Sequence, residues 1–185
     1  MISEDYQLRV NQALQALGIP NEYLIRSGLP FYAEGRELVV AETDANGRDY
    51  RLIPQAAQAW KAMKEAARQD GITIEIFSSF RNLEQQIAII RNKLDRGIPI
   101  QKILTLSAPP GYSEHHTGRA LDINTPGCRP TETEFEDTAA FRWLQLHAGG
   151  FGFTLSYPPD NELGFIYEPW HWCWQFPEAQ AAEAA

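Results

Sequence analysis

The sequence is short of cysteine, of net basic charge and of long apolar segments, and each shortage excludes a class of protein. Its 185 residues include two cysteines, Cys128 and Cys173, which could form one disulfide or none. They form no C-x-x-C pair, so we expect no sulfur-ligated metal site. The 16 basic residues are outnumbered by 24 acidic residues, which gives a net charge of −8. Because nucleic-acid binding depends on neutralising phosphates, we expect no nucleic-acid partner.

No window of the sequence approaches the roughly 20 apolar residues that a transmembrane helix needs, so we expect no membrane-spanning segment. Residues 1–6 are acidic and lack the basic and apolar regions of a secretory signal. We therefore expect either a cytoplasmic protein or one whose leader is missing, and the sequence does not choose between them. The chain length and the hydrophobic fraction of 44% predict one domain over residues 1–185, which we expect to be a monomer.

Hydrophobic periodicity predicts a mixture of helices and short strands. Apolar residues at helical spacing predict helices over residues 5–17, 54–70, 83–94 and 135–148, the last with Ala139, Trp143 and Leu146 facing inward. Strand formers predict strands near 38–41, 50–53, 72–77, 120–123 and 151–157, the last returning as a hairpin through 164–167. We expect an N-terminal helix and hairpin over 1–52, a core over 53–175 and a frayed tail over 176–185. The fold class is α+β, with a small antiparallel sheet and helices packed on one side.

Candidate metal ligands begin in the stretch 113–122. His115 and Asp122 could each bind a first-row metal, but one such pair occurs often by chance. His171 adds a third donor. Two imidazoles and a carboxylate match the three protein ligands of a catalytic zinc, which keeps a position for water.

Glu168, three residues before His171, supplies a further carboxylate. Such a group can take a proton from bound water and pass it to a leaving amine. A regular strand would place Glu168 and His171 on opposite faces. Pro169 interrupts strand pairing between them, so we expect a bend that brings both side chains to one site.

Two motifs carry a family resemblance. Ser113-x-His115-x-x-Gly118-x-Ala120-x-Asp122, followed by Glu168-x-x-His171, resembles the signature of the VanY-type D-alanyl-D-alanine carboxypeptidases. These are zinc peptidases related to lysostaphin-like peptidases and hedgehog domains. Ser78-Ser79-Phe80-Arg81 resembles the family's Ser-Gly-Tyr-Arg element, with Gln86 at the expected place after it, but Ser79 and Phe80 replace the usual Gly and Tyr. The likeness runs from about residue 53 to residue 175.

The resemblance implies specific roles for these residues. One Zn²⁺ would be held by His115, Asp122 and His171 in the cleft of the sheet. Glu168 would act as the catalytic acid and base, and the Arg81 guanidinium would face the developing oxyanion or the substrate carboxylate. The resemblance also implies contacts with the peptide end, from Ser113 and Gln86. From the strand pattern, we add Trp170 to the expected wall of the site.

The implied function is zinc-dependent hydrolysis of the terminal D-Ala-D-Ala bond of peptidoglycan stem peptides. The partner would be a stem peptide or its precursor, which points to the cell envelope although no export signal is visible. An L,D-carboxypeptidase or an endopeptidase using the same site is the nearer alternative. A non-catalytic zinc-binding module is the alternative from another class, and the presence of Glu168 and Arg81 argues against it.

Four residues near these motifs have structural interpretations. We expect His116 to be a solvated or core-capping imidazole rather than a support for the metal, and His147 to interact with helix-terminal carbonyls. Glu114 is interpreted as a polar loop residue. Cys173 replaces a residue that is commonly basic in the family, and we expect it to be buried.

Overall fold

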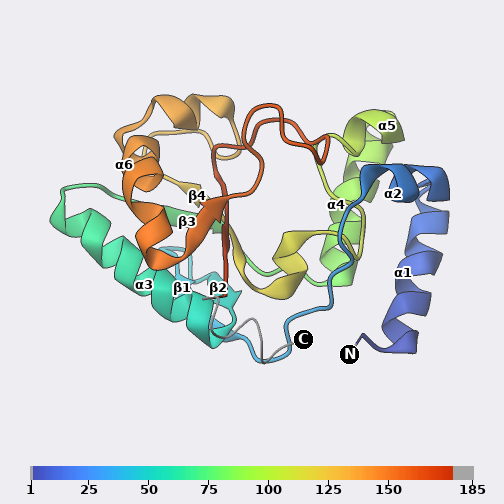
Figure 1. The fold of residues 1–185 in the computed structure, drawn as a ribbon, viewed down its shortest axis with the longest axis horizontal. Coiled ribbons are helices and arrows are strands. Elements are labelled where there is room, and N and C mark those ends of the chain that lie inside the picture. Colours follow the sequence, from blue (N-terminus) through green and yellow to red (C-terminus); the bar gives the residue numbers. More distant parts are fainter. Residues whose placement is uncertain (1, 177–185) are drawn as a thin grey trace.

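The computed structural model describes residues 2–176, which form two antiparallel sheets and two groups of helices (Figure 1). The helices are α1 (Glu4–Ala16), α2 (Asn21–Ser27), α3 (Pro54–Gln69), α4 (Leu83–Asp95), α5 (Ile100–Ile103) and α6 (Ala139–His147). The strands are β1 (Val39–Thr43), β2 (Asp49–Leu52), β3 (Glu75–Ser78), β4 (Ala120–Asn124), β5 (Phe153–Leu155) and β6 (His171–Trp174). Three short 3₁₀ helices are η1 (Glu114–Thr117), η2 (Thr133–Asp137) and η3 (Ala148–Phe151). The α+β class is confirmed, and the expected tail beyond residue 176 lies outside the described residues.

The four-stranded sheet has the order β3-β4-β6-β5, with every neighbouring pair antiparallel. The register places Asp122 of β4 directly opposite His171 of β6. Because side chains alternate along a strand, Leu121 and Trp172 lie on the face opposite to Asp122 and His171 and enter the main core. Strand pairing thus puts two of the three candidate ligands side by side.

The helices form two groups, seen to the left and right in Figure 1. α3 and α6 cover one face of the four-stranded sheet, with Trp60 and Leu144 buried against its strands. α1, α4 and α5 share a second core that includes Val10, Ile90 and Ile103. A cavity lies between this second group of helices and the sheet, since Ile89 and Lys93 of α4 and Asp122 and His171 of the sheet all line it.

Local chemistry fixes the start of α4 immediately after Arg81. The Asn82 side chain accepts a hydrogen bond from the Gln85 backbone, and the Gln85 side chain accepts one from the Asn82 backbone. This reciprocal capping box satisfies two backbone N–H groups at the start of the helix. The position of Arg81 is therefore tied to a rigid helix end.

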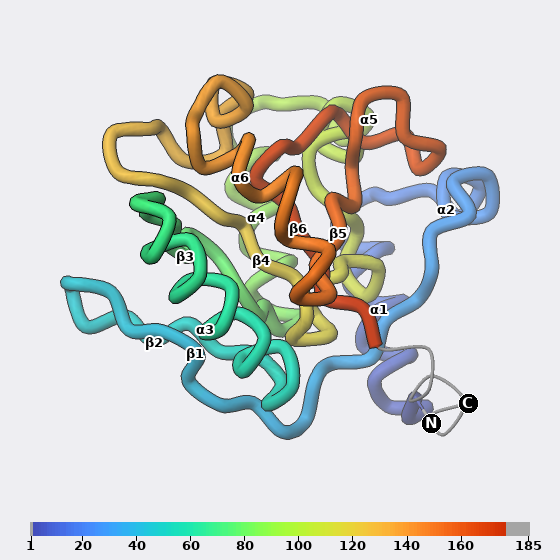
Figure 2. Tube along the Cα trace, turned by 60° about the vertical axis from the view of Figure 1, so that its left-hand side comes forward, coloured from blue at the N-terminus to red at the C-terminus, as the bar shows by residue number. Residues whose placement is uncertain are grey.

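The segment 28–38, called here the N-terminal strap, joins α2 to β1 (Figure 2). Its Tyr32 N–H donates to the Gly111 carbonyl at 2.8 Å, and its Gly35 N–H donates to the His116 carbonyl at 2.7 Å. The Glu34 carboxylate accepts from the backbone N–H of Leu83, the first residue of α4. The strap thus contacts both the loop that carries the histidines and the helix that follows Arg81.

Several expected elements differ from the structure. The helix expected over 135–148 is divided into η2 and α6, because Thr138 caps α6 with its side chain. Its buried face contains Ala140, Phe141, Trp143 and Leu144, whereas Ala139 is exposed and Leu146 is 80% exposed. The expected inward set was wrong at these two positions because the apolar stripe lies about one residue out of phase.

The hairpin expected between residues 151–157 and 164–167 was also wrong. Only residues 153–155 form a strand, β5, and this strand pairs with β6. The Asn161 side chain instead closes a loop by hydrogen bonding with the backbone of Phe165. α2 had not been expected at all. None of the helices within residues 2–176 has the length and apolar character required to cross a bilayer.

Candidate metal centre and active site

His115, Asp122 and His171 come together from η1, β4 and β6. One ligand atom from each lies within 4.8 Å of the others, and all three residues are buried. The Asp122 Oδ1 atom lies 3.3 Å from His115 Nε2 and 3.1 Å from His171 Nδ1. Two imidazole nitrogens and a carboxylate oxygen converging in this way form a donor set suited to a transition metal.

The tautomer of His115 is fixed by its surroundings. Its Nδ1 lies 2.6 Å from the Ser79 carbonyl oxygen, which only accepts, so Nδ1 carries the proton. The opposite nitrogen, Nε2, is buried and has no hydrogen-bond partner among residues 2–176. A buried unpaired acceptor costs free energy unless something binds it. The free lone pair of His115 therefore fits a metal ion.

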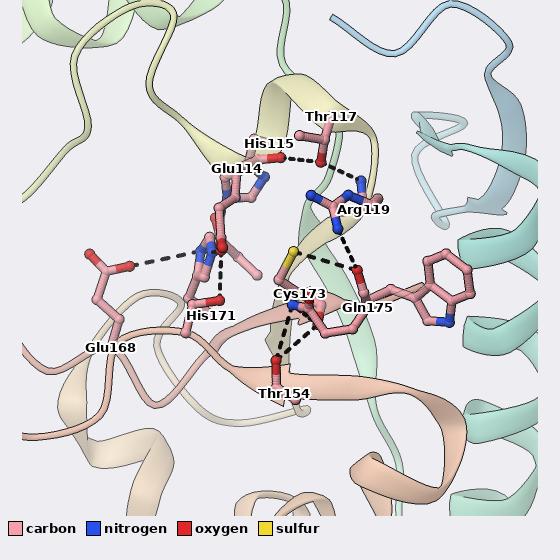
Figure 3. A network of polar contacts seen from close by, with 12 residues as sticks. Glu114, His115, Thr117, Arg119, Thr154, Glu168, His171, Cys173 and Gln175 are labelled. Carbon is pink, nitrogen blue, oxygen red and sulfur yellow. Dashed lines mark hydrogen bonds and ion pairs between the residues drawn. The ribbon is translucent and has the colours of Figure 1, made fainter. Parts of the chain in front are cut away.

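In its neutral form, which a metal ligand must have, His171 carries its proton on the opposite nitrogen, Nε2. Its Nε2 lies 2.9 Å from Glu114 Oε2, and this oxygen also accepts from the Ser156 hydroxyl at 2.6 Å. Figure 3 shows Glu114 and His171 pointing toward one another. With the Nε2 proton donated to Glu114, the Nδ1 atom faces Asp122. The Tyr157 ring lies against the His171 ring, with centroids 4.6 Å apart, and holds it in this orientation.

Glu114 is the residue of the site that sequence reasoning missed. Carboxylates that accept the second N–H of a metal-binding histidine orient the ring and raise its basicity. Glu114 occupies this position toward His171, 57 residues away in the chain. The only signal in the sequence is a carboxylate beside His115, which by itself is common in loops.

A tight turn brings Glu168 to the site. The His171 N–H donates to the Glu168 carbonyl at 3.0 Å, with Pro169 at the second position of the turn, where proline is favoured. The Glu168 Oε2 atom lies 3.9 Å from His171 Nδ1, and Figure 3 shows the two side chains linked. The bend expected from Pro169 is present, and Glu168 shares one site with His171.

Burial sets the protonation state of Glu168. It raises the pKa of the Glu168 carboxyl to about 7, because the charges of His171, Arg81 and Lys93, which lower this pKa, only partly offset burial and Asp122. A carboxyl with a pKa near neutrality is suited to accept and return a proton.

The two histidines differ in charge. Burial lowers the pKa of His115 to about 4, so its imidazole is neutral at pH 7. Burial also acts to lower the pKa of His171, but the hydrogen bonds and charges of Asp122 and Glu114 outweigh it and raise that pKa to about 10. Burial acts to raise the pKa of Asp122, yet both histidines hold it well below its usual range. Without metal, the site therefore holds a proton on His171.

A cavity of about 220 Å³ opens beside these groups. Arg81, Ser113 and Trp170 line it together with the three candidate ligands and Glu168, so these expected site residues lie in one cavity. Gln86 is not among the lining residues. It is buried, and its amide donates to the Ala108 carbonyl at 2.7 Å, so it supports the cavity wall from behind.

His116 holds the main chain of Arg81. It is 0% exposed; its Nε2 accepts from the Gly111 N–H at 3.1 Å, and its Nδ1 donates to the Arg81 carbonyl at 2.7 Å. Both ring nitrogens are thus occupied by backbone groups. Cys128 and Cys173 are both free, and Cys173 is buried on β6 as expected.

Comparison with known proteins agrees with this site. The sequence profile of the family VanY, D-alanyl-D-alanine carboxypeptidase, matches residues 49–177. The chain belongs to this VanY family. The resemblance stated from the motifs is therefore confirmed. A curated VanY-like relative, the putative carboxypeptidase YodJ of Bacillus subtilis (strain 168), is 36% identical over 152 residues, which cover 77% of this chain and 55% of YodJ.

Solved structures support the VanY fold. The LdcB LD-carboxypeptidase superposes with a TM-score of 0.70 at 29% identity, covering 83% of this chain and 74% of LdcB. A mutant of the vancomycin resistance D,D-pentapeptidase VanY, solved in complex with Zn(II), has a TM-score of 0.61 at 30% identity, covering 82% of this chain and 90% of that protein. This chain spans about half the length of the curated VanY relatives that it matches.

Proposed function

We propose that the protein is a zinc-dependent carboxypeptidase that hydrolyses the terminal D-Ala-D-Ala bond of peptidoglycan stem peptides. The observation that supports this proposal is the buried set of His115, Asp122 and His171 beside Glu168, with no hydrogen-bond partner for His115 Nε2 in the described part of the chain. Membership of the VanY family and the Zn(II) complex of a VanY enzyme support the same conclusion.

The ligands proposed for Zn²⁺ are His115 Nε2, Asp122 Oδ1 and His171 Nδ1. When bound, Zn²⁺ acts as a Lewis acid that lowers the pKa of its water and polarises the scissile carbonyl. Glu168 takes the proton from the attacking water and returns it to the leaving amine. Burial raises the pKa of Glu168 to about 7 in the metal-free protein, and a nearby Zn²⁺ would lower this pKa and favour the carboxylate that accepts the proton. Glu114 keeps the proton of His171 on Nε2, which leaves Nδ1 available as a ligand.

Arg81 lines the same cavity, and its guanidinium can stabilise the oxyanion that develops on the scissile carbonyl or bind the substrate carboxylate. We propose Ser113 and Trp170 as substrate contacts, because both line the cavity. Gln86 acts through Ala108, the wall residue to which its amide is bonded. His116 fixes the backbone of Arg81, and with it the point from which the Arg81 side chain extends into the cavity.

A second candidate is an L,D-carboxypeptidase acting on tetrapeptide stems. The likeness to the LdcB LD-carboxypeptidase, with its TM-score of 0.70, favours this alternative. The two activities share the metal chemistry and differ in the configuration of the residue before the scissile bond. A non-catalytic zinc module has less support, because a structural metal site has no use for a carboxyl with a pKa near 7 in an open cavity.

Defined stem peptides test these alternatives. The zinc-loaded protein is incubated with a pentapeptide stem ending in D-Ala-D-Ala, with a tetrapeptide stem and with a cross-linked dimer, each with and without chelator. We expect release of D-alanine from the pentapeptide, abolished by chelator and restored by Zn²⁺. Cleavage of the tetrapeptide or the dimer alone would replace the proposal by an L,D-carboxypeptidase or an endopeptidase. Zinc binding with no cleavage would identify a binding module.

A further inference from the structure

Lys93 extends from α4 to the cavity of the site. It is half-buried, and its Nζ donates to the Ser107 hydroxyl at 2.7 Å. The Ser107 hydroxyl in turn donates to the Leu106 carbonyl at 2.7 Å. Lys93, Ser107 and Leu106 line the same cavity as Arg81, with Ile89 one helical turn before Lys93. The sequence motifs do not include Lys93 or Ser107.

The two cations of this cavity have no close carboxylate partner. Within residues 2–176, no carboxylate oxygen lies within 4.0 Å of the Lys93 ammonium or the Arg81 guanidinium. Of the acidic residues that line the cavity, Asp122 faces the two histidines, and the charge of Glu168 acts on Arg81 and Lys93 only from beyond 4.0 Å. Partly buried charges without such a partner are costly. A cavity with two of them is suited to a ligand that brings negative charge.

Lys93 is also arranged to accept such a ligand. An ammonium group has three N–H donors, and Ser107 takes one of them. Because the Ser107 proton is donated to Leu106, the hydroxyl presents a lone pair to Lys93 and holds the ammonium in place. Across residues 2–176 the remaining Lys93 donors have no hydrogen-bond partner, so they can bind an anionic oxygen. Charge-assisted hydrogen bonds of this kind are stronger than neutral ones.

We propose that Lys93, held by Ser107, forms a second anion subsite in the cavity, which binds a carboxylate of the peptide substrate. Arg81 then binds one anionic oxygen of the substrate, and Lys93 binds another. The carboxylate has two possible sources in a stem peptide: the free C-terminus, or a side-chain carboxylate on a residue before the scissile bond. This inference deepens the proposed function and, for its kinetic test, rests on it.

Two pairs of peptides separate the sources. One pair differs only in a C-terminal carboxylate or carboxamide, and the other only in a side-chain carboxylate or carboxamide. We expect the wild type to prefer the carboxylate in at least one pair. Lys93→Met should raise KM for that peptide by about 10- to 100-fold and leave KM for its amide unchanged. Loss of the Lys93 charge also raises the pKa of Glu168, so any change in kcat should be the same for the peptide and its amide. Lys93→Arg should restore the preference, which a purely structural role of Lys93 would not require.

Lys102→Met is the matched control, because Lys102 is an exposed lysine on α5 and its loss changes the net charge equally. If Lys93→Met loses the preference for the carboxylate in either pair while Lys102→Met keeps it, the subsite is supported and its carboxylate is identified. Unchanged preferences in both pairs for Lys93→Met would overturn the inference and leave the proposed function intact. If the wild type cleaves none of the peptides, the proposed function fails. Calorimetric binding of the same four peptides to wild type and Lys93→Met then decides the subsite by itself.

Discussion

Replacing His116 with leucine tests whether this histidine is an anchor for Arg81 rather than a metal ligand. The substitution removes the acceptor of the Gly111 N–H and the donor to the Arg81 carbonyl, which lie 3.1 Å and 2.7 Å from the ring nitrogens. Each buried backbone group left without a partner costs about 1–3 kcal/mol. We expect His116→Leu to lower the free energy of unfolding by about 2–6 kcal/mol, which corresponds to about 5–20 °C in Tm for a chain of this size.

The pH dependence of this difference gives a second test. Burial lowers the pKa of His116 from 6.5 to about 4. Between these values the unfolded chain binds a proton that the folded chain refuses, so the wild type loses stability as the pH falls from 6.5 toward 4. His116→Leu lacks this titrating group, so it does not lose stability in this way. The stability difference between the two proteins should therefore narrow by about 3 kcal/mol at pH 4.

Urea unfolding with chelator present measures the difference in unfolding free energy and its pH dependence without a contribution from metal. His147→Leu is the control, because His147 is an exposed histidine at the end of α6, and its loss should change stability by less than about 0.5 kcal/mol. In the zinc-loaded proteins, His116→Leu should keep its metal content and lose kcat/KM. A His116→Leu protein as stable as His147→Leu would refute the anchoring role, and loss of zinc would show that His116 is a ligand.

Three further substitutions test other parts of the site. Glu168→Gln should keep zinc, measured by elemental analysis, while kcat on the pentapeptide falls by about 10²–10⁴-fold because the proton acceptor is lost; near wild-type turnover would end the proposed mechanism. Glu114→Gln should flatten the rise of zinc affinity between pH 7 and 9, since Glu114 helps to raise the pKa of His171 to about 10 and metal must displace that proton; equal slopes in competition titrations would contradict the role of Glu114. Gly118→Ala should destabilise the fold by about 1–3 kcal/mol, because Gly118 has a φ of 69° and an added Cβ would lie 2.7 Å from the Leu38 side chain; an unchanged urea midpoint would exclude this strain.

The residues proposed as metal ligands could be predicted from the sequence because the motifs that contain them are short and local. The spacing of His115 and Asp122 and the alternation of side chains along β4 and β6 depend on neighbouring residues. The turn at Pro169 is likewise encoded where it occurs, so the approach of Glu168 to His171 could be anticipated.

Other parts of the site depend on contacts between distant segments. Glu114 meets His171 only because η1 and the turn before β6 fold onto each other, and Ser156 completes the contact from the end of β5. Gln86 points to Ala108 because the loop after α5 packs on α4. The buried face of α6 was misassigned at Leu146 because the start of a short helix sets its phase. No local pattern encodes these relations.

The N-terminal strap lies before the family match at residues 49–177, yet it bonds to the loop that carries the candidate ligand His115. Tyr32 and Gly35 donate to the histidine loop through backbone N–H groups, which every residue except proline possesses. Of the two, Gly35 is further restricted, since a Cβ there would lie 2.8 Å from the Thr117 carbonyl oxygen. Such a segment can diverge in sequence and keep its place. The LdcB superposition covers 83% of the chain. Residues 49–185 make up a smaller share of the 185 residues, so the superposition must include residues before position 49, where the match to the family profile begins. An excised fragment starting at residue 49 would keep every proposed ligand and lose the backbone partners that hold their loop.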